Sequence, residues 1–284
     1  RSMHRAFYEY PADSYGLVYW SHADGWIPYP VPSASTRWIG QDTGEGQDNR
    51  MNISDFVDVL DDGMPHFDFI MFDACFMMSV EVAYEVRNYT DYYIGSPTEN
   101  PGPGAPYDKV VPYMFKPGAA AQMAEAYFNH YKDNYKAGEG ISNANWTGGT
   151  SICAVRTDAL DDLADVTGQL LERADNESVP SFNTVFDYDK RDMEEGHVGY
   201  YDFSQMMEMR LDADAYVAWK NVFDASIVYW NTTDKNYSMF KRMFSMEGTN
   251  GITHYIPLSV DSKAAEAYRS MAWYKAAGLE NMGW

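Results

Sequence analysis

Two residues of the sequence carry side chains that can together break an amide bond, His22 and Cys75. Each follows a short apolar run, residues 15–20 before the histidine and residues 67–72 before the cysteine. A thiolate is a strong nucleophile, and a nearby imidazole can take the thiol proton and later protonate a leaving amine. The alternative is an inert buried thiol and a hydrogen-bonded turn histidine. The residue types alone favour the inert thiol and turn histidine. The position of both residues after a strand makes the catalytic pair about equally well supported.

The apolar run before Cys75 predicts a buried strand, because β-favouring residues follow one another with little alternation. Buried parallel strands deliver their C-terminal residues to the open edge of a sheet, where α/β proteins place their sites. Asp73 precedes Cys75 by two positions, so the two side chains point to the same face of an extended chain. If the strand before His22 is a parallel neighbour, His22 and Cys75 rise at the same edge.

Strands that alternate with helices over residues 1–157 predict βαβ units, an α/β fold and a mainly parallel sheet. The other strands are expected at residues 92–96 and 150–155, and helices at 52–60, 79–88, 113–135 and 158–176. Long loops are expected at 27–49 and 97–107. After an irregular stretch at 181–200, the pattern predicts helices at 203–209, 213–230, 241–246 and 264–277, with one strand at 251–258.

The composition excludes several classes of partner. Lys and Arg number 21 against 42 Asp and Glu, a formal charge of −21, which argues against nucleic acids and anionic membranes. The same charge suits basic substrates, or is simply a solvated acidic surface. The sequence contains no apolar stretch of transmembrane length. The cysteines, Cys75 and Cys153, form neither a disulfide framework nor a zinc motif, and no residue is assigned as a metal ligand.

Two short motifs resemble those of the clostripain family of cysteine peptidases. Residues 21–26, Ser-His-Ala-Asp-Gly-Trp, are similar to the family's His-Gly-x-Gly-Trp, and residues 73–77, Asp-Ala-Cys-Phe-Met, to its Asp-Ala-Cys-Leu-Met. Residues 96–107 and 251–257 extend the resemblance over nearly the whole chain. The order also matches a caspase-type site, where the histidine precedes the cysteine by roughly 50 residues.

The resemblance implies a caspase-like three-layer α/β/α sandwich and an endopeptidase that cuts after Arg or Lys, with no required cofactor. It implies that Cys75 is the nucleophile and His22 the base, and that Asp73 receives the basic side chain of the substrate. A carboxylate suits this role because it pairs with guanidinium or ammonium groups. Ser96 is expected to line the same pocket. The backbone N–H groups of Ala23 and Cys75 are the candidate oxyanion donors.

Three positions depart from the family pattern: Ala23 and Met78 replace glycines, and Ala105 replaces a tryptophan. If the backbone at Ala23 needs a positive φ, alanine costs roughly 1 kcal/mol there. These departures support a second hypothesis, a catalytically weakened homologue that acts as an exported or cell-surface binding module.

Further expectations concern the whole protein. Residues 1–157 are predicted to form the catalytic core and residues 158–284 a mostly helical part of the same unit that returns one strand. The family's first core strand is expected to be absent from this chain or supplied by a separate N-terminal fragment. Self-cleavage is expected after Arg37 rather than Arg50. Acidic residues 42–48 and 187–195 make calcium a candidate ligand, although neither has EF-hand spacing. Export from the cell is expected because the resemblance is to a family whose members are usually exported.

Overall fold

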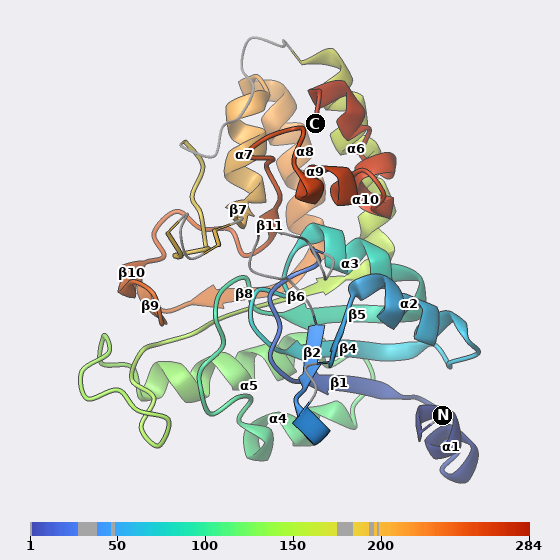
Figure 1. Ribbon diagram of the computed structural model, residues 1–284, viewed down its shortest axis with the longest axis vertical. Coiled ribbons are helices and arrows are strands. Elements are labelled where there is room, and N and C mark those ends of the chain that lie inside the picture. The colour runs from blue at the N-terminus through green and yellow to red at the C-terminus, as the bar shows by residue number, and fades with distance from the viewer. Residues whose placement is uncertain (1, 28–38, 47–48, 175–183, 193–195, 198) are drawn as a thin grey trace.

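The computed structural model describes residues 2–27, 39–46, 49–174, 184–192, 196–197 and 199–284. Among these residues the centre is a five-stranded sheet with the order β1-β4-β5-β6-β8 (Figure 1). Its strands are β1 (Gly16–Trp20), β4 (Phe67–Asp73), β5 (Thr90–Gly95), β6 (Ser151–Arg156) and β8 (Ile227–Thr232). β1, β4 and β5 are parallel, whereas β6 runs opposite to its neighbours β5 and β8. The predicted α/β class with a mainly parallel sheet is confirmed.

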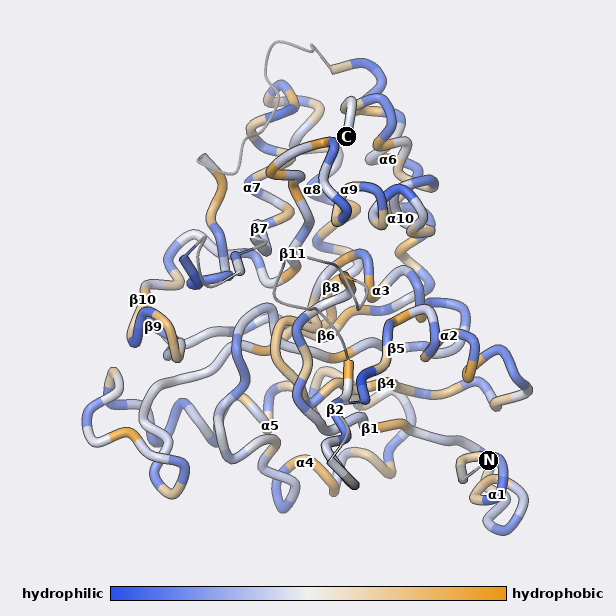
Figure 2. Tube along the Cα trace, in the orientation of Figure 1, coloured by the Kyte–Doolittle hydropathy of each residue, from blue (hydrophilic) through white to orange (hydrophobic). Residues whose placement is uncertain are grey.

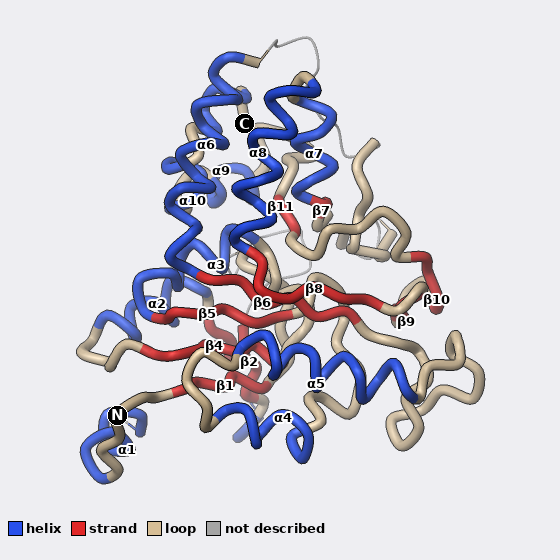
Figure 3. The backbone as a smooth tube through the Cα atoms, turned by 180° about the vertical axis from the view of Figure 1, so that it is seen from behind, coloured by secondary structure: helices blue, strands red, loops and turns tan. Residues whose placement is uncertain are grey.

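Helices cover both faces of the sheet, as the predicted three-layer sandwich requires (Figures 1 and 3). α4 (Tyr107–Met114) and α5 (Ala120–Asp133) lie on one face, and α2 (Ile53–Asp61) and α3 (Val80–Val86) on the other. The alternation of side chains along β4 serves both layers: Phe69 and Met71 pack in the cluster of α5, and Ile70 and Phe72 in that of α2 and α3. In Figure 2 the central strands contain many hydrophobic residues, which agrees with burial on both faces of the sheet.

The remaining elements lie mostly in the C-terminal half. The helices are α1 (Ser2–Glu9), α6 (Leu160–Arg173), α7 (Phe203–Arg210), α8 (Ala213–Ser226), α9 (Lys263–Tyr268) and α10 (Ala272–Ala276). Three antiparallel pairs join β2 (Ile39–Asp42) to β3 (Asn49–Met51), β7 (Tyr201–Asp202) to β11 (Thr253–His254) and β9 (Lys235–Ser238) to β10 (Arg242–Ser245). None of the helices in the described part of the chain combines the length and apolar composition of a membrane span.

Several element predictions are wrong, and each error has a local cause. The helix predicted at 113–135 is two helices, because Pro117 and Gly118 interrupt it, and the first begins already at Tyr107. The helix predicted at 213–230 ends at Ser226, since the β-favouring run that follows forms β8.

The segments 241–246, 251–258 and 27–49 also differ from their predictions. Residues 242–245 form strand β10 rather than a helix. In 251–258 only Thr253 and His254 are in a strand, and that strand pairs with β7 outside the main sheet. The strand that the C-terminal half returns to the main sheet is therefore β8. The predicted loop 27–49 contains strand β2.

A buried acid ties the C-terminal half to the helix that follows Cys75. Glu81, in the first turn of α3, has no exposed surface and accepts a hydrogen bond from Tyr255 N at 2.8 Å. His254 Nδ1 lies 4.0 Å from Glu81 Oε1 and 2.7 Å from the Tyr255 carbonyl oxygen, and Trp273 Nε1 donates to its Nε2. Because Nε2 accepts, the proton is on Nδ1 and His254 is neutral. Burial lowers its pKa to about 3.

Replacing Glu81 with glutamine is expected to stabilise the protein more at pH 8 than at pH 5. Burial raises the pKa of Glu81 from 4.5 to about 7. The folded state therefore keeps a proton that the unfolded chain releases above pH 4.5. As the pH rises from 4.5 to 7, the free energy of unfolding of the wild type falls by about 3 kcal/mol. Below pH 6.5 the unfolded chain takes up a proton on His254 and stability falls as the pH falls, but this effect is the same in both proteins. Denaturant unfolding of both proteins from pH 4 to 9 measures the difference, and a pH-independent difference contradicts the assignment.

Candidate active site

The register between β1 and β4 places His22 and Cys75 at the same level of the sheet. These strands are parallel neighbours, and Trp20 on β1 is aligned with Asp73 on β4. Each candidate residue follows its aligned strand residue by two positions. Adjacent strands are roughly 4.8 Å apart, so the two loops leave the sheet side by side. The condition on which the proximity of His22 and Cys75 depended, a parallel pairing of these two strands, is therefore met.

The loop that carries His22 is held by the β2–β3 hairpin. Gly40 N donates to the His22 carbonyl oxygen at 2.9 Å, and Ala23 forms an antiparallel bridge with Ile39. The His22 side chain is exposed, and none of the described residues hydrogen-bonds its ring. A third residue that orients the imidazole is therefore absent from the described part of the chain. Because the bridge uses the His22 carbonyl, it leaves the N–H of Ala23 available.

The positive φ considered for Ala23 occurs at Phe76 instead. The described non-glycine residues with positive φ are Phe76 (58°), Ala137 and Arg242, so Ala23 is unstrained. The Phe76 N–H donates to the Thr98 carbonyl oxygen at 3.0 Å, which holds this left-handed turn directly after Cys75. Unusual backbone conformations of this kind often occur at functional sites.

The Cys75 thiol is half-buried and protonated at neutral pH. Asn100 N donates to Cys75 Sγ at 3.2 Å. Burial raises the pKa of the thiol to about 12; the Asn100 N–H opposes this rise, and the carboxylates of Glu99, Asp24 and Asp73 add to it. A group that accepts the proton during the reaction is therefore needed, and the neighbouring loop offers His22.

Asp73 lies beneath the site and holds the loop that follows β5. Only 3% of its surface is exposed, and its carboxylate accepts from Ala105 N at 2.7 Å, the Tyr107 hydroxyl at 3.0 Å and Asn100 Nδ2 at 3.0 Å. Burial raises its pKa, and these three bonds oppose the rise. A Cβ on Gly104 would lie 3.0 Å from Asp73 Oδ2, and φ there is +77°, so this close approach requires glycine.

Asn100 is a site residue that the sequence did not single out. Its backbone contacts the Cys75 sulfur and its side chain contacts Asp73. Its Oδ1 is buried, and no donor among the described residues reaches it. Asn100 occupies a variable position of the motif at 96–107, so motif comparison gave no signal for it.

Ser96 and Met78 are used inside the fold. The Ser96 hydroxyl is fully buried and lies 3.2 Å from the hydroxyls of both Thr98 and Ser151, which does not support the predicted pocket role. Met78 is also fully buried; its N–H donates to the Ser96 carbonyl, and its own carbonyl accepts from Thr253 N. The methionine thus fills the core rather than altering the pocket.

Two predictions fall wholly or partly on residues that are not described. Arg37 lies outside the described residues, as do 47–48 and 193–195 of the two acidic stretches. Among the described acids of the second stretch, Asp187, Asp189 and Asp192 pair with His197, Arg191 and Lys241. No group of three potential metal ligands occurs among the described residues.

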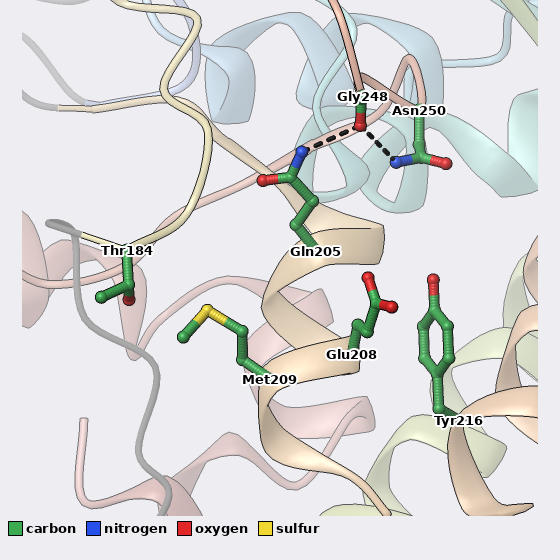
Figure 4. A pocket seen from close by; sticks show the side chains of 7 residues that line it. All are labelled: Thr184, Gln205, Glu208, Met209, Tyr216, Gly248 and Asn250. Carbon is green, nitrogen blue, oxygen red and sulfur yellow. Dashed lines mark hydrogen bonds between the residues drawn. The ribbon is translucent and has the colours of Figure 1, made fainter. Parts of the chain in front are cut away.

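Two cavities differ in their relation to the site. One, of about 360 Å³, lies next to His22 and is lined by Trp20 and Ser21 of the His22 side and by Gln41 and Arg50 of the β2–β3 hairpin. The other, of about 510 Å³, lies at α7 and α8, where Glu208 and Tyr216 line it (Figure 4). Neither cavity is lined by His22 or Cys75, but the first includes Ser21, the residue directly before His22.

Comparisons with known proteins show which family the chain belongs to. The family model described as the clostripain family matches residues 2–281. A secreted C11 cysteine protease from Bacteroides thetaiotaomicron, solved with an irreversible peptide inhibitor, is 44% identical with a TM-score of 0.86 over 98% of this chain and 76% of its own. A cysteine protease from B. fragilis is 38% identical with a TM-score of 0.77 over 87% of this chain and 99% of its own.

A more distant structure has the same fold. An inactive zymogen C11 protease from Parabacteroides distasonis is 27% identical, with a TM-score of 0.78 over 97% of this chain and 73% of its own. The search of curated proteins gives no match. With a family model that spans almost the whole sequence, the chain belongs to the clostripain family of C11 cysteine proteases.

Proposed function

We propose that the protein is an endopeptidase that cuts after Arg or Lys by means of a Cys75–His22 dyad. The observation that carries the proposal is the β1–β4 register, which brings the loops of His22 and Cys75 to one sheet edge. The half-buried Cys75 suits a nucleophile, and the exposed His22 suits a base.

Each proton transfer in the proposed reaction involves a group of the dyad. His22 takes the thiol proton as Cys75 Sγ bonds to the substrate carbonyl carbon, and then gives it to the leaving amine as the C–N bond breaks. Water, deprotonated by His22, attacks the thioester and releases the carboxylic acid and the thiol. The N–H groups of Ala23 and Cys75 are the proposed donors to the oxyanion.

Specificity for a basic side chain rests on two acceptors beside the thiol. A carboxylate has about four acceptor sites, and described donors occupy three of those on Asp73, leaving one on Oδ1. Asn100 Oδ1 is a second buried acceptor, on the amide that contacts Asp73. Together they suit the N–H groups of a guanidinium or ammonium, as the net charge of −21 suits a basic substrate.

Replacing Asp73 with asparagine is expected to lower kcat/KM for an arginine substrate by about 10- to 100-fold, because a hydrogen bond to a charged group contributes about 1.5–3 kcal/mol. The matched substrate carries citrulline, a neutral isostere of arginine, and kcat/KM for it should change much less. Tyr107→Phe, which removes one neutral donor to Asp73, serves as the control variant. Equal losses on both substrates after Asp73→Asn contradict a specificity role.

Two of the three departures behind the weakened-homologue hypothesis are accommodated by the fold, since φ at Ala23 is not positive and Met78 is buried in the core. Export is part of the proposal, and the secreted relative from Bacteroides thetaiotaomicron supports it. Self-cleavage after Arg37 also stays a proposal. Mass spectrometry after long incubation of active protein tests it, and a chain that stays intact through Arg37 contradicts it.

A further inference from the structure

A segment far along the chain contacts both candidate catalytic loops. Residues 186–192 and 199–202, here called the bracing segment, fold back on themselves: Tyr188 N donates to the Tyr200 carbonyl and Asp202 N to the Phe186 carbonyl, both at 2.8 Å. Its end, β7, pairs with β11. Thr253 of β11 in turn donates its backbone N–H to the carbonyl oxygen of Met78, at the end of the Cys75 loop. The bracing segment therefore has a fixed attachment beside Cys75.

The first contact is a buried ion pair with the His22 loop. Arg191 Nη1 and Nη2 donate to the two carboxylate oxygens of Asp24 at 2.6 and 2.9 Å, and its Nε donates to Asp189 at 2.7 Å. The exposed fraction is 6% for the Arg191 side chain and 14% for that of Asp24. Burial opposes the charge of Arg191, but the two carboxylates outweigh it and raise the pKa of the guanidinium. This bidentate geometry fixes direction as well as distance.

The second contact involves Tyr200 and reaches both loops at once. Its hydroxyl donates to the Asp24 carbonyl oxygen at 2.5 Å, and its ring stacks on Phe76 with centroids 4.9 Å apart and planes 13° apart. A Cβ on Gly25 would lie 2.2 Å from the Tyr200 hydroxyl, so glycine allows this approach. The Arg191 guanidinium also lies over the Phe76 ring, 5.2 Å from its centroid.

The contacted residues adjoin the reacting side chains. Asp24 follows His22 by two positions, and Phe76 follows Cys75 directly. Phe76 has a positive φ, a conformation that neighbouring contacts must maintain. A displacement of about 1 Å between reacting groups can cost about 100-fold in rate. Fixing both loops with one rigid group is thus a direct way to set the geometry of a dyad that has no third residue among those described.

We propose that Arg191 and Tyr200 are positioning residues that hold the His22 loop, through Asp24, at a fixed distance from Cys75, through Phe76. The proposal rests on the proposed dyad. It concerns the rate of the chemical step and not the binding of substrate, because none of these contacts involves Asp73 or Asn100.

Conservative variants test the proposal on arginine and lysine peptides. Tyr200→Phe removes only the hydroxyl, and Arg191→Lys keeps the charge but loses the bidentate fork. We expect each to lower kcat by about 10- to 100-fold per competent site with KM changed less than about twofold. Competent sites are counted by titration with an irreversible peptide ketone. Arg156→Met, which breaks the exposed pair of Arg156 with Asp158, is the matched control and should keep the wild-type kcat.

A double variant separates the ion pair from general destabilisation. If Arg191 acts through Asp24, then Asp24→Asn, Arg191→Lys and the double variant should show similar losses of kcat rather than a multiplied loss. Wild-type kcat per competent site in both Tyr200→Phe and Arg191→Lys, with only fewer competent sites, overturns the positioning role. If the positioning role fails in this way while Cys75→Ala is inactive, the proposed function still stands. If the wild type itself shows no turnover, the proposed function is overturned.

Discussion

Replacing Cys75 with alanine is expected to lower kcat on arginine- and lysine-ending peptides by at least about 1000-fold, because the substitution removes the sulfur that forms the proposed covalent intermediate. The substitution removes one partly exposed sulfur atom and leaves the hydrogen bonds of Asp73 in place. The folded state should persist, and binding of a substrate-like peptide should change little. Steady-state kinetics with purified variants measures the loss.

The second cysteine provides the matched control for this experiment. Cys153 is fully buried in β6, and burial raises the pKa of its thiol far above neutrality. Such a thiol does not ionise or reach a substrate. Cys153→Ala should therefore keep kcat per folded molecule. Turnover by Cys75→Ala that approaches the wild-type rate contradicts the assignment of the nucleophile.

Replacing His22 with alanine is expected to lower kcat/KM at pH 7 by about 1000-fold or more. Burial raises the pKa of the Cys75 thiol to about 12, so the thiol is protonated at pH 7 and the reaction depends on a base. In the variant, hydroxide must supply the thiolate. Below the thiol pKa its kcat/KM should therefore rise about tenfold per pH unit, whereas the wild type should reach a plateau.

His130 supplies the control for this variant, since it is also an exposed histidine but lies on α5. His130→Ala should retain the wild-type rate and pH profile. A His22→Ala enzyme with a wild-type plateau would show that another group takes the thiol proton.

The N-terminal half of the sheet was largely predictable from the sequence, for a physical reason. β4 is buried on both faces, so its apolar run is continuous, and the acid and thiol at its end mark the sheet edge. The pairing of β1 with β4 could be stated only as a condition, because register depends on contacts between distant residues. The reversed direction of β6 leaves no local signal in its sequence.

The C-terminal half was less predictable because tertiary contacts override local pattern there. β8 continues directly from α8 without a breaker, and β10 has a helix-compatible composition. The site shows the same limit. The positions of Asp24 and Phe76 were visible in the motifs, but the partners Arg191 and Tyr200 come from a charged segment that sequence periodicity described only as irregular.

The Cys75–His22 dyad is tested most directly by the mass of the protein after reaction with a peptidyl chloromethyl ketone that ends in arginine. We expect one adduct, mapped to Cys75, which fails to form in Cys75→Ala and forms much more slowly in His22→Ala. A matched reagent that ends in aspartate should label far more slowly. Absence of an adduct in the wild type, or an adduct at any residue other than Cys75, would contradict it.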